Sequence, residues 1–167
     1  MRIDIHHKIG KSVYSELKEL GFTTNEKLFL LGNIFPDLIQ SYIWCRHEYQ
    51  HSREYVSRKL NMLKKRPRLF SFHLGVLTHY ICDYFCYPHN VCYDRGLVQH
   101  ILYEIRQKAP KKCYRTKLNI AAFSIEELDK LVKWYEDFRD FFDDAESDFH
   151  IATVVSSNFL QAAYQGR

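Results

Sequence analysis

Residues 69–85 read LFSFHLGVLTHYICDYF, and this stretch decides the fold. Wound as a helix it is apolar on most sides, which is typical of a helix at the centre of a protein. His79 and Asp83 stand four residues apart, so they lie one turn apart on the same helix face. A buried aspartate is costly unless it is paired or bound to a metal. The stretch therefore predicts a central helix that carries a histidine and an aspartate in need of a partner.

A second pair with the same spacing follows along the chain, formed by His100 and Glu104. Between the two pairs stands His89, directly after Pro88, where the chain must turn. One such pair alone is more often a hydrogen bond on a helix surface. Two pairs with a histidine between them favour a metal site, because imidazole and carboxylate groups bind zinc at about 2.0–2.2 Å.

The cysteines of the same region allow a different metal site. Cys82, Cys86, His89 and Cys92 have the spacing C-x3-C-x2-H-x2-C, which is within reach of a structural zinc site. Three thiolates would compete with His79 and Asp83 for space, because Cys82 and Cys86 fall in the same helical stripe. We favour the interpretation that the cysteines are small core residues.

The rest of the chain also has helical periodicity. Apolar residues spaced over Ile9–Leu20 predict a first helix, and Thr24 is the expected N-cap of the second. Because Pro36 restricts the residue before it, we expect Gly32–Asp37 to form a loop or a helix end. Further helices are expected from 52 to a break at 64–67, from 96 to 108, from 124 onward and from 148 to 164. With no strand periodicity, the sequence predicts one all-α domain over residues 1–167, a multi-helix bundle.

Composition indicates the cellular compartment in which the protein is expected. The 46% hydrophobic content is ample for one packed core. No apolar run reaches the 18 or so residues that a transmembrane helix needs, and residues 1–20 lack a secretory leader. The five cysteines, an odd number, fit free thiols in a reducing compartment. We therefore expect a cytoplasmic protein without a transmembrane segment.

The charges are unevenly distributed although the net charge is only +4. Residues 106–117 contain six basic side chains and no acid, and residues 126–148 are rich in acids. Such a pattern is more often a pair of solvated faces than a nucleic-acid groove. Nucleic acid is therefore not an expected partner.

The order H-Y-x-x-D-x-x-x-x-P-H followed by H-x-x-x-E resembles the core motif of the bacterial zinc-dependent phospholipases C. The related trinuclear zinc single-strand nucleases share the same all-α fold. The match is carried residue by residue by His79, Asp83, His89, His100 and Glu104. The resemblance implies that these five side chains are metal ligands.

Further upstream the resemblance is carried by single residues. Gly32–Asp37 resembles the family segment G-x-x-x-P-D, whose aspartate is a metal ligand. The family histidine that follows it resembles His47, with His51 as a nearby alternative. The histidine of the family's N-terminal helix resembles His6, with His7 as its competitor.

The resemblance covers residues 6–104 and implies how many ions are bound. In the family, one ion is held by the equivalents of Asp37, His47, His79 and Asp83, and a second by those of His89, His100 and Glu104. A third is shared by Asp83, the N-terminal histidine and the free amine of an N-terminal tryptophan. This chain begins Met1-Arg2 and has no tryptophan near its start, so we expect two zinc ions, with three as the alternative.

The activity implied is that of a zinc-dependent phosphoester hydrolase similar to phospholipase C. Zinc lowers the pKa of bound water to about 7, and two or more ions can clamp phosphoryl oxygens. We expect Asp37 to be a ligand or the proton acceptor for the attacking water, and Asp83 to position the ions. The expected substrate is a small phosphoester or a phospholipid. The alternatives are a metal-binding protein of the same fold without catalysis, and a nuclease or nucleotidase.

Overall fold

The structure, a computed structural model, consists of helices joined by loops in the part of the chain that it describes, with no strand there. It describes residues 1–21, 25–39, 47–65, 70–90, 93, 95–107, 118, 120, 124–138 and 145–165. The helices are α1 (Ile3–Glu19), α2 (Glu26–Leu38), α3 (Tyr49–Lys65), α4 (Phe70–Tyr84), the 3-10 helix η2 (Tyr87–His89), α5 (Gly96–Arg106), α6 (Ile125–Phe138) and α7 (Ala145–Gln165). The prediction of an all-α fold is confirmed.

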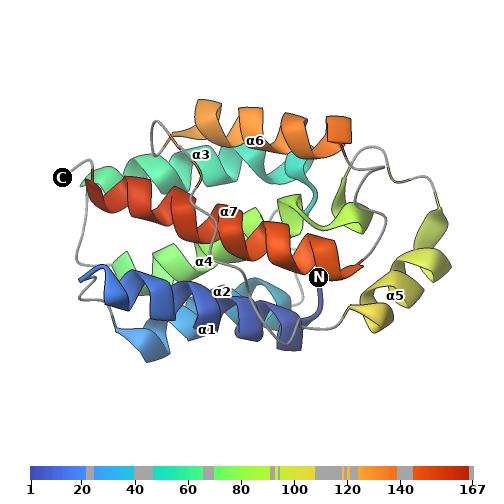
Figure 1. Ribbon diagram of the computed structural model, residues 1–167, viewed down its shortest axis with the longest axis horizontal. Coiled ribbons are helices and arrows are strands. Elements are labelled where there is room, and N and C mark those ends of the chain that lie inside the picture. The colour runs from blue at the N-terminus through green and yellow to red at the C-terminus, as the bar shows by residue number, and fades with distance from the viewer. Residues whose placement is uncertain are drawn as a thin grey trace.

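Helix α4 lies at the centre of the bundle, as its apolar sequence predicts. Twelve of its fifteen residues are buried, and it contacts α1, α2, α3 and α7. Figure 1 shows α4 behind α7, with α1 and α2 on one side and α3 and α6 on the other. Because every side of α4 is covered, the polar side chains that it carries must find their partners inside the protein.

Two glycines set the distance between α2 and α4. A Cβ atom on Gly32 would lie 2.0 Å from the carbonyl oxygen of Phe72, and one on Gly75 would lie 2.0 Å from that of Phe29. Only glycine allows the two backbones to approach this closely. The close crossing brings the C-terminal half of α2, which ends with Asp37 and Leu38, alongside the second half of α4.

The beginning and the end of α2 differ from the prediction. The N-cap is Asn25, whose side-chain oxygen accepts a hydrogen bond from Leu28 N at 3.0 Å, and Thr24 lies outside the described residues. Gly32–Asp37, predicted as a loop or helix end, continues the helix with Pro36 inside it. The segment is therefore a helix end, since α2 stops at Leu38, and the loop alternative was wrong because the packing of α2 against α4 overrides the local preference of proline.

Three other predictions from the sequence concern the first helix, the absence of a membrane span and the basic run. Helix α1 begins at Ile3, before the apolar residues that predicted it, so His6 and His7 are both helical. No helix among the described residues is both long and apolar enough to cross a bilayer. Of the basic run at 106–117 the structure describes Arg106 and Gln107, and its residues 108–117 lie outside the described part.

Candidate metal centre

The floor of the site is formed by three fully buried side chains from α1 and α4. Nε2 of His6 lies 3.2 Å from Oδ1 of Asp83, and Nε2 of His79 lies 3.2 Å from Oδ2 of the same carboxylate. These three donors are close enough together to hold one metal ion. The helical spacing of α4 brings His79 and Asp83 together, and the packing of α1 against α4 adds His6.

His79 also belongs to a second group, with Asp37 at the end of α2 and His47 just before α3. Its Nδ1–H donates to the carbonyl oxygen of Asn33 at 2.9 Å. A carbonyl can only accept, so the proton of a neutral ring sits on Nδ1 and Nε2 keeps its lone pair. Nε2 lies 3.2 Å from Nδ1 of His47 and 3.7 Å from Oδ1 of Asp37. The hydrogen bond from α2 thus orients His79 as a metal-ligating histidine requires.

The third group comes from η2 and α5. Oε1 of Glu104 lies 3.1 Å from Nε2 of His100 and 3.3 Å from Nε2 of His89. All three residues offer atoms close enough to hold one ion. The pair on α5 has the spacing seen in the sequence, and the turn after Pro88 directs His89 toward it.

The α-amino group of Met1 lies between the first and third groups. Its nitrogen is 2.9 Å from Oδ1 of Asp83, 2.7 Å from Nε2 of His89 and 3.0 Å from Oε1 of Glu104. Burial disfavours the ammonium form, yet the attraction of Asp83, Cys86 and Glu104 outweighs it and raises the pKa of this amine. Met1 was not among the expected site residues. The available signal was its position just before α1, five residues ahead of His6.

The candidate ligands differ in their exposure to solvent. His6, His79 and Asp83 are fully buried. The remaining five candidate ligands are between 11 and 26% exposed, and they are Asp37, His47, His89, His100 and Glu104. The arrangement has a dry floor and an accessible rim, which together suit a site that receives a small ligand from solution.

Burial and neighbouring charges set the protonation states. Burial, together with the like charge of His79, lowers the pKa of His6 to about 3. Burial opposes ionisation of Asp83, but the Met1 amine and the surrounding histidines hold the pKa of that carboxyl well below its usual value. Burial raises the pKa of Asp37, with His79 opposing the shift. The floor therefore offers a neutral imidazole and a charged carboxylate, which are the protonation states that metal ions bind.

Several buried polar atoms have no hydrogen-bond partner among the described residues. They include Nδ1 of His6 and Oδ2 of Asp37. An unpaired buried polar atom costs about 1–3 kcal/mol, so each needs an explanation. A bound metal ion would explain these atoms, because the donors around the site are imidazole nitrogens and carboxylate oxygens, which are common zinc ligands. The residues present thus fit zinc.

The two pairs of neighbouring histidines differ in position. His6 and His47 lie in the donor groups. His51 is exposed and pairs with Glu48 at 2.7 Å, and His7 lines a surface hollow.

The rival thiol site lacks support in the described part of the chain. Cys82 and Cys86 are buried, with Sγ atoms near Ser156 Oγ at 3.5 Å and Gln107 Nε2 at 3.2 Å. No donor group found among the described residues contains a cysteine, and Cys92 lies outside them.

Asp148 on α7 is a further residue beside the site that its sequence context does not reveal. Its fully buried carboxylate accepts hydrogen bonds from Tyr87 N at 2.9 Å and from the hydroxyls of Tyr103 and Tyr135. Tyr87 stands two residues before His89, and Tyr103 directly precedes Glu104. One buried carboxylate thus connects both elements of the third group to α7. No local pattern signals this role, because its partners are distant in sequence.

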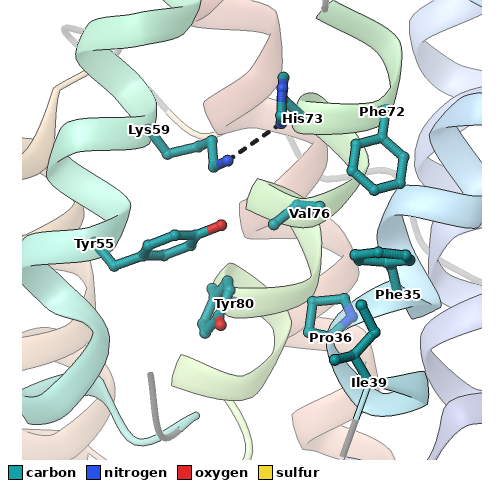
Figure 2. Close-up of a pocket in the computed structure, with 9 residues that line it drawn as sticks. All are labelled: Phe35, Pro36, Ile39, Tyr55, Lys59, Phe72, His73, Val76 and Tyr80. Atoms are coloured by element: carbon teal, nitrogen blue, oxygen red, sulfur yellow. Dashed lines mark hydrogen bonds between the residues drawn. The ribbon is translucent and has the colours of Figure 1, made fainter. Parts of the chain in front are cut away.

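A small apolar pocket adjoins the site between α2 and α3, over the surface of α4 (Figure 2). Its volume is about 80 Å³, and it is lined by Phe35, Pro36, Ile39, Tyr55, Lys59, Phe72, His73, Val76 and Tyr80. At one end the ring of Tyr80 contacts those of His47 and His79, with centroids 5.7 and 5.5 Å apart. At the other end Lys59 Nζ donates to His73 Nδ1 at 3.2 Å.

Comparison with known proteins agrees with this geometry. A family model described as zinc dependent phospholipase C matches residues 5–158. The match covers most of the chain and continues beyond Glu104, where the resemblance seen in the sequence ended, into α7. Comparisons with curated proteins and with solved structures found no match. With its all-α fold and its histidine and carboxylate groups, the chain belongs to the zinc-dependent phospholipase C family.

Proposed function

We propose that the protein is a zinc-dependent phosphoester hydrolase that cleaves the head-group ester of a phospholipid. The observation that carries the proposal is the contrast between the buried floor and the exposed rim of the donor cluster. The exposed rim gives water or a phosphoryl oxygen access to an ion held there, whereas a structural zinc site is closed by four protein ligands.

The candidate ligands divide into three sets in this proposal. Asp37, His47 and His79 would hold one ion, and His89, His100 and Glu104 would hold a second, with Asp83 close to both groups and to His6. Zinc bound there would supply Lewis-acid polarisation and a more acidic water. Asp37, at the partly exposed rim, would be a ligand or would accept the proton of the attacking water.

We further propose that a third ion is held by His6, Asp83 and the Met1 amine. The distances from Met1 N to Asp83, His89 and Glu104 support this proposal. An amine at this position is a metal donor once it has lost its proton, and metal binding drives that loss. The role expected of an N-terminal tryptophan amine would then be filled by Met1.

The apolar pocket beside the site supports a lipid substrate. It begins at Tyr80, whose ring touches two candidate ligands, and its lining is mostly aromatic and aliphatic. A hydrolase for nucleic acid would need a basic groove with aromatic side chains. We propose the lipid ester as the substrate because this apolar lining directly adjoins two of the candidate ligands.

The test is hydrolysis by protein of known zinc content. Zinc-loaded protein is incubated with a water-soluble chromogenic phosphodiester and with phosphatidylcholine, and released phosphate esters are measured. We expect both to be cleaved, and chelation followed by zinc addition to abolish and restore the reaction. Protein that retains stoichiometric zinc but cleaves neither substrate would instead be a metal-binding protein of the same fold.

A further inference from the structure

Helix α5 presents an exposed apolar face, formed by Leu97, Val98, Ile101, Leu102 and Ile105. These side chains are between 38 and 74% exposed. At about 100° per residue they fall on one side of the helix. No residue within α5 is buried, and Figure 1 shows the helix standing apart from the bundle at one end. Apolar residues gathered on one surface in this way mark an interaction site more often than chance exposure.

The orientation of this face is set by the metal centre. His100 and Glu104 project from a neighbouring side of α5 toward His89 and the Met1 amine. On the inner side, the Tyr103 hydroxyl donates to Asp148 of α7. The helix therefore cannot turn its apolar face inward without withdrawing two candidate ligands. The exposed face is continuous with the rim of the site.

Cations stand at both ends of the same helix. Arg95 immediately precedes α5 and Arg106 is its last residue, and both are exposed. Arg2 reaches the C-terminal end, where Nη1 lies 3.5 Å from the carbonyl oxygen of Ile105, while its Nε pairs with Asp4 at 2.9 Å. The helix itself contains one acid, Glu104, which belongs to the donor cluster. An apolar face flanked by arginines fits an element that lies in the interface of an anionic membrane.

We propose that α5 docks the protein on an anionic phospholipid surface, with its apolar face entering the head-group region beside the metal centre. The inference rests on the proposed function, because a phospholipid substrate is presented at such a surface. A second copy of the chain is the weaker occupant. An eleven-residue helix is about 16 Å long and about 10 Å wide. The area of one face of such a helix is far smaller than the roughly 800 Å² per partner that a stable dimer buries.

The experiment compares vesicle binding by wild-type protein and by the double variant Leu97→Gln, Val98→Gln. The control is Leu28→Gln, Leu31→Gln, which removes two exposed leucines from α2 instead. Zinc-loaded full-length protein is sedimented with vesicles of phosphatidylcholine, with and without phosphatidylserine. We expect the α5 variant to lose about tenfold or more in binding to the anionic vesicles, since apolar burial and charge together set interfacial affinity. The control variant should bind as the wild type does.

The readouts separate this inference from the proposed function. Binding is measured without turnover, and hydrolysis is measured separately on the soluble phosphodiester, which the α5 variant should cleave within about twofold of the wild-type rate. Vesicle binding without any hydrolysis would leave the docking helix standing and refute the proposed activity. Equal vesicle binding by the α5 variant and the wild type would refute docking through α5. Equal binding to neutral and anionic vesicles, or a dimer in solution that the α5 variant dissociates, would also overturn the inference.

Discussion

The imidazole rings of His6 and His79 stack with centroids 3.9 Å apart and planes inclined by 23°, although the two residues come from α1 and α4. Two protonated rings would repel each other at this distance. Burial, which lowers the pKa of His6 to about 3, keeps its ring neutral. The stack places two imidazoles against the two oxygens of Asp83.

Asp83→Asn tests whether one carboxylate serves the whole cluster. Asparagine keeps the size of the side chain but removes the negative charge that faces His6, His79 and the Met1 amine. We expect a folded protein whose hydrolysis of a chromogenic phosphodiester falls by about a hundredfold or more, the scale of one electrostatic group. Activity and zinc content are measured on the same sample. The control is Asp129→Asn, which removes a carboxylate on α6 that pairs with Arg53, and it should leave the activity unchanged. An active Asp83→Asn enzyme would contradict the prediction.

The third ion is tested by extending the chain before Met1. A Gly-Ser dipeptide added there converts the amine into an amide, which is a poor metal donor. We expect zinc, measured by elemental analysis, to fall from about three to about two ions per chain. The same dipeptide after Arg167 is the matched control. Equal zinc content in both extended proteins would show that the amine is not a ligand.

Asp148→Asn tests how the third donor group is held. The carboxylate accepts three hydrogen bonds while fully buried, so its replacement should lower the free energy of unfolding by about 2 kcal/mol. Because Tyr87 and Tyr103 adjoin His89 and Glu104, zinc affinity should also fall by about tenfold or more, as when the partners that orient metal ligands are lost. Asp137→Asn, at a surface pair with Lys133, is the control. A loss of stability with unchanged zinc affinity would assign Asp148 a purely structural role.

Gly75→Ala tests the close crossing of α2 and α4. The new methyl group would lie 2.0 Å from the carbonyl oxygen of Phe29, so the helices must move apart. We expect a loss of about 3 kcal/mol in unfolding free energy, at the upper end for overpacking, measured by chemical denaturation. Ser15→Ala on the exposed side of α1 should change stability by less than about 0.5 kcal/mol. Equal stability of the two variants would mean that the crossing adjusts freely.

Replacing the three cysteines Cys82, Cys86 and Cys92 by alanine separates the two metal sites. Cys82 and Cys86 are buried beside Ser156 and Gln107, and no donor group among the described residues contains a cysteine. We expect the triple variant to keep its zinc and His100→Ala to lose part of it. The reverse result would favour the thiol site.

The sequence by itself determined the central helix, because its apolar pattern repeats with the helical period and needs no knowledge of distant residues. The same local period placed His79 with Asp83 and His100 with Glu104. The resemblance to the family rested on these two pairs together with His89. The expected helices fall where α3 to α7 lie, with differences of a few residues at their ends.

Tertiary structure alone decided which distant groups join them. His6 and His47 enter the cluster while His7 and His51 stay outside, and the Met1 amine and Asp148 have no local pattern that marks them. Pro36 lies inside α2 because glycines let α2 pack closely on α4. The physical reason is common to these cases. A helical period reports only which side chains share a face, whereas the contacts between faces depend on how closely and at what angle the helices pack.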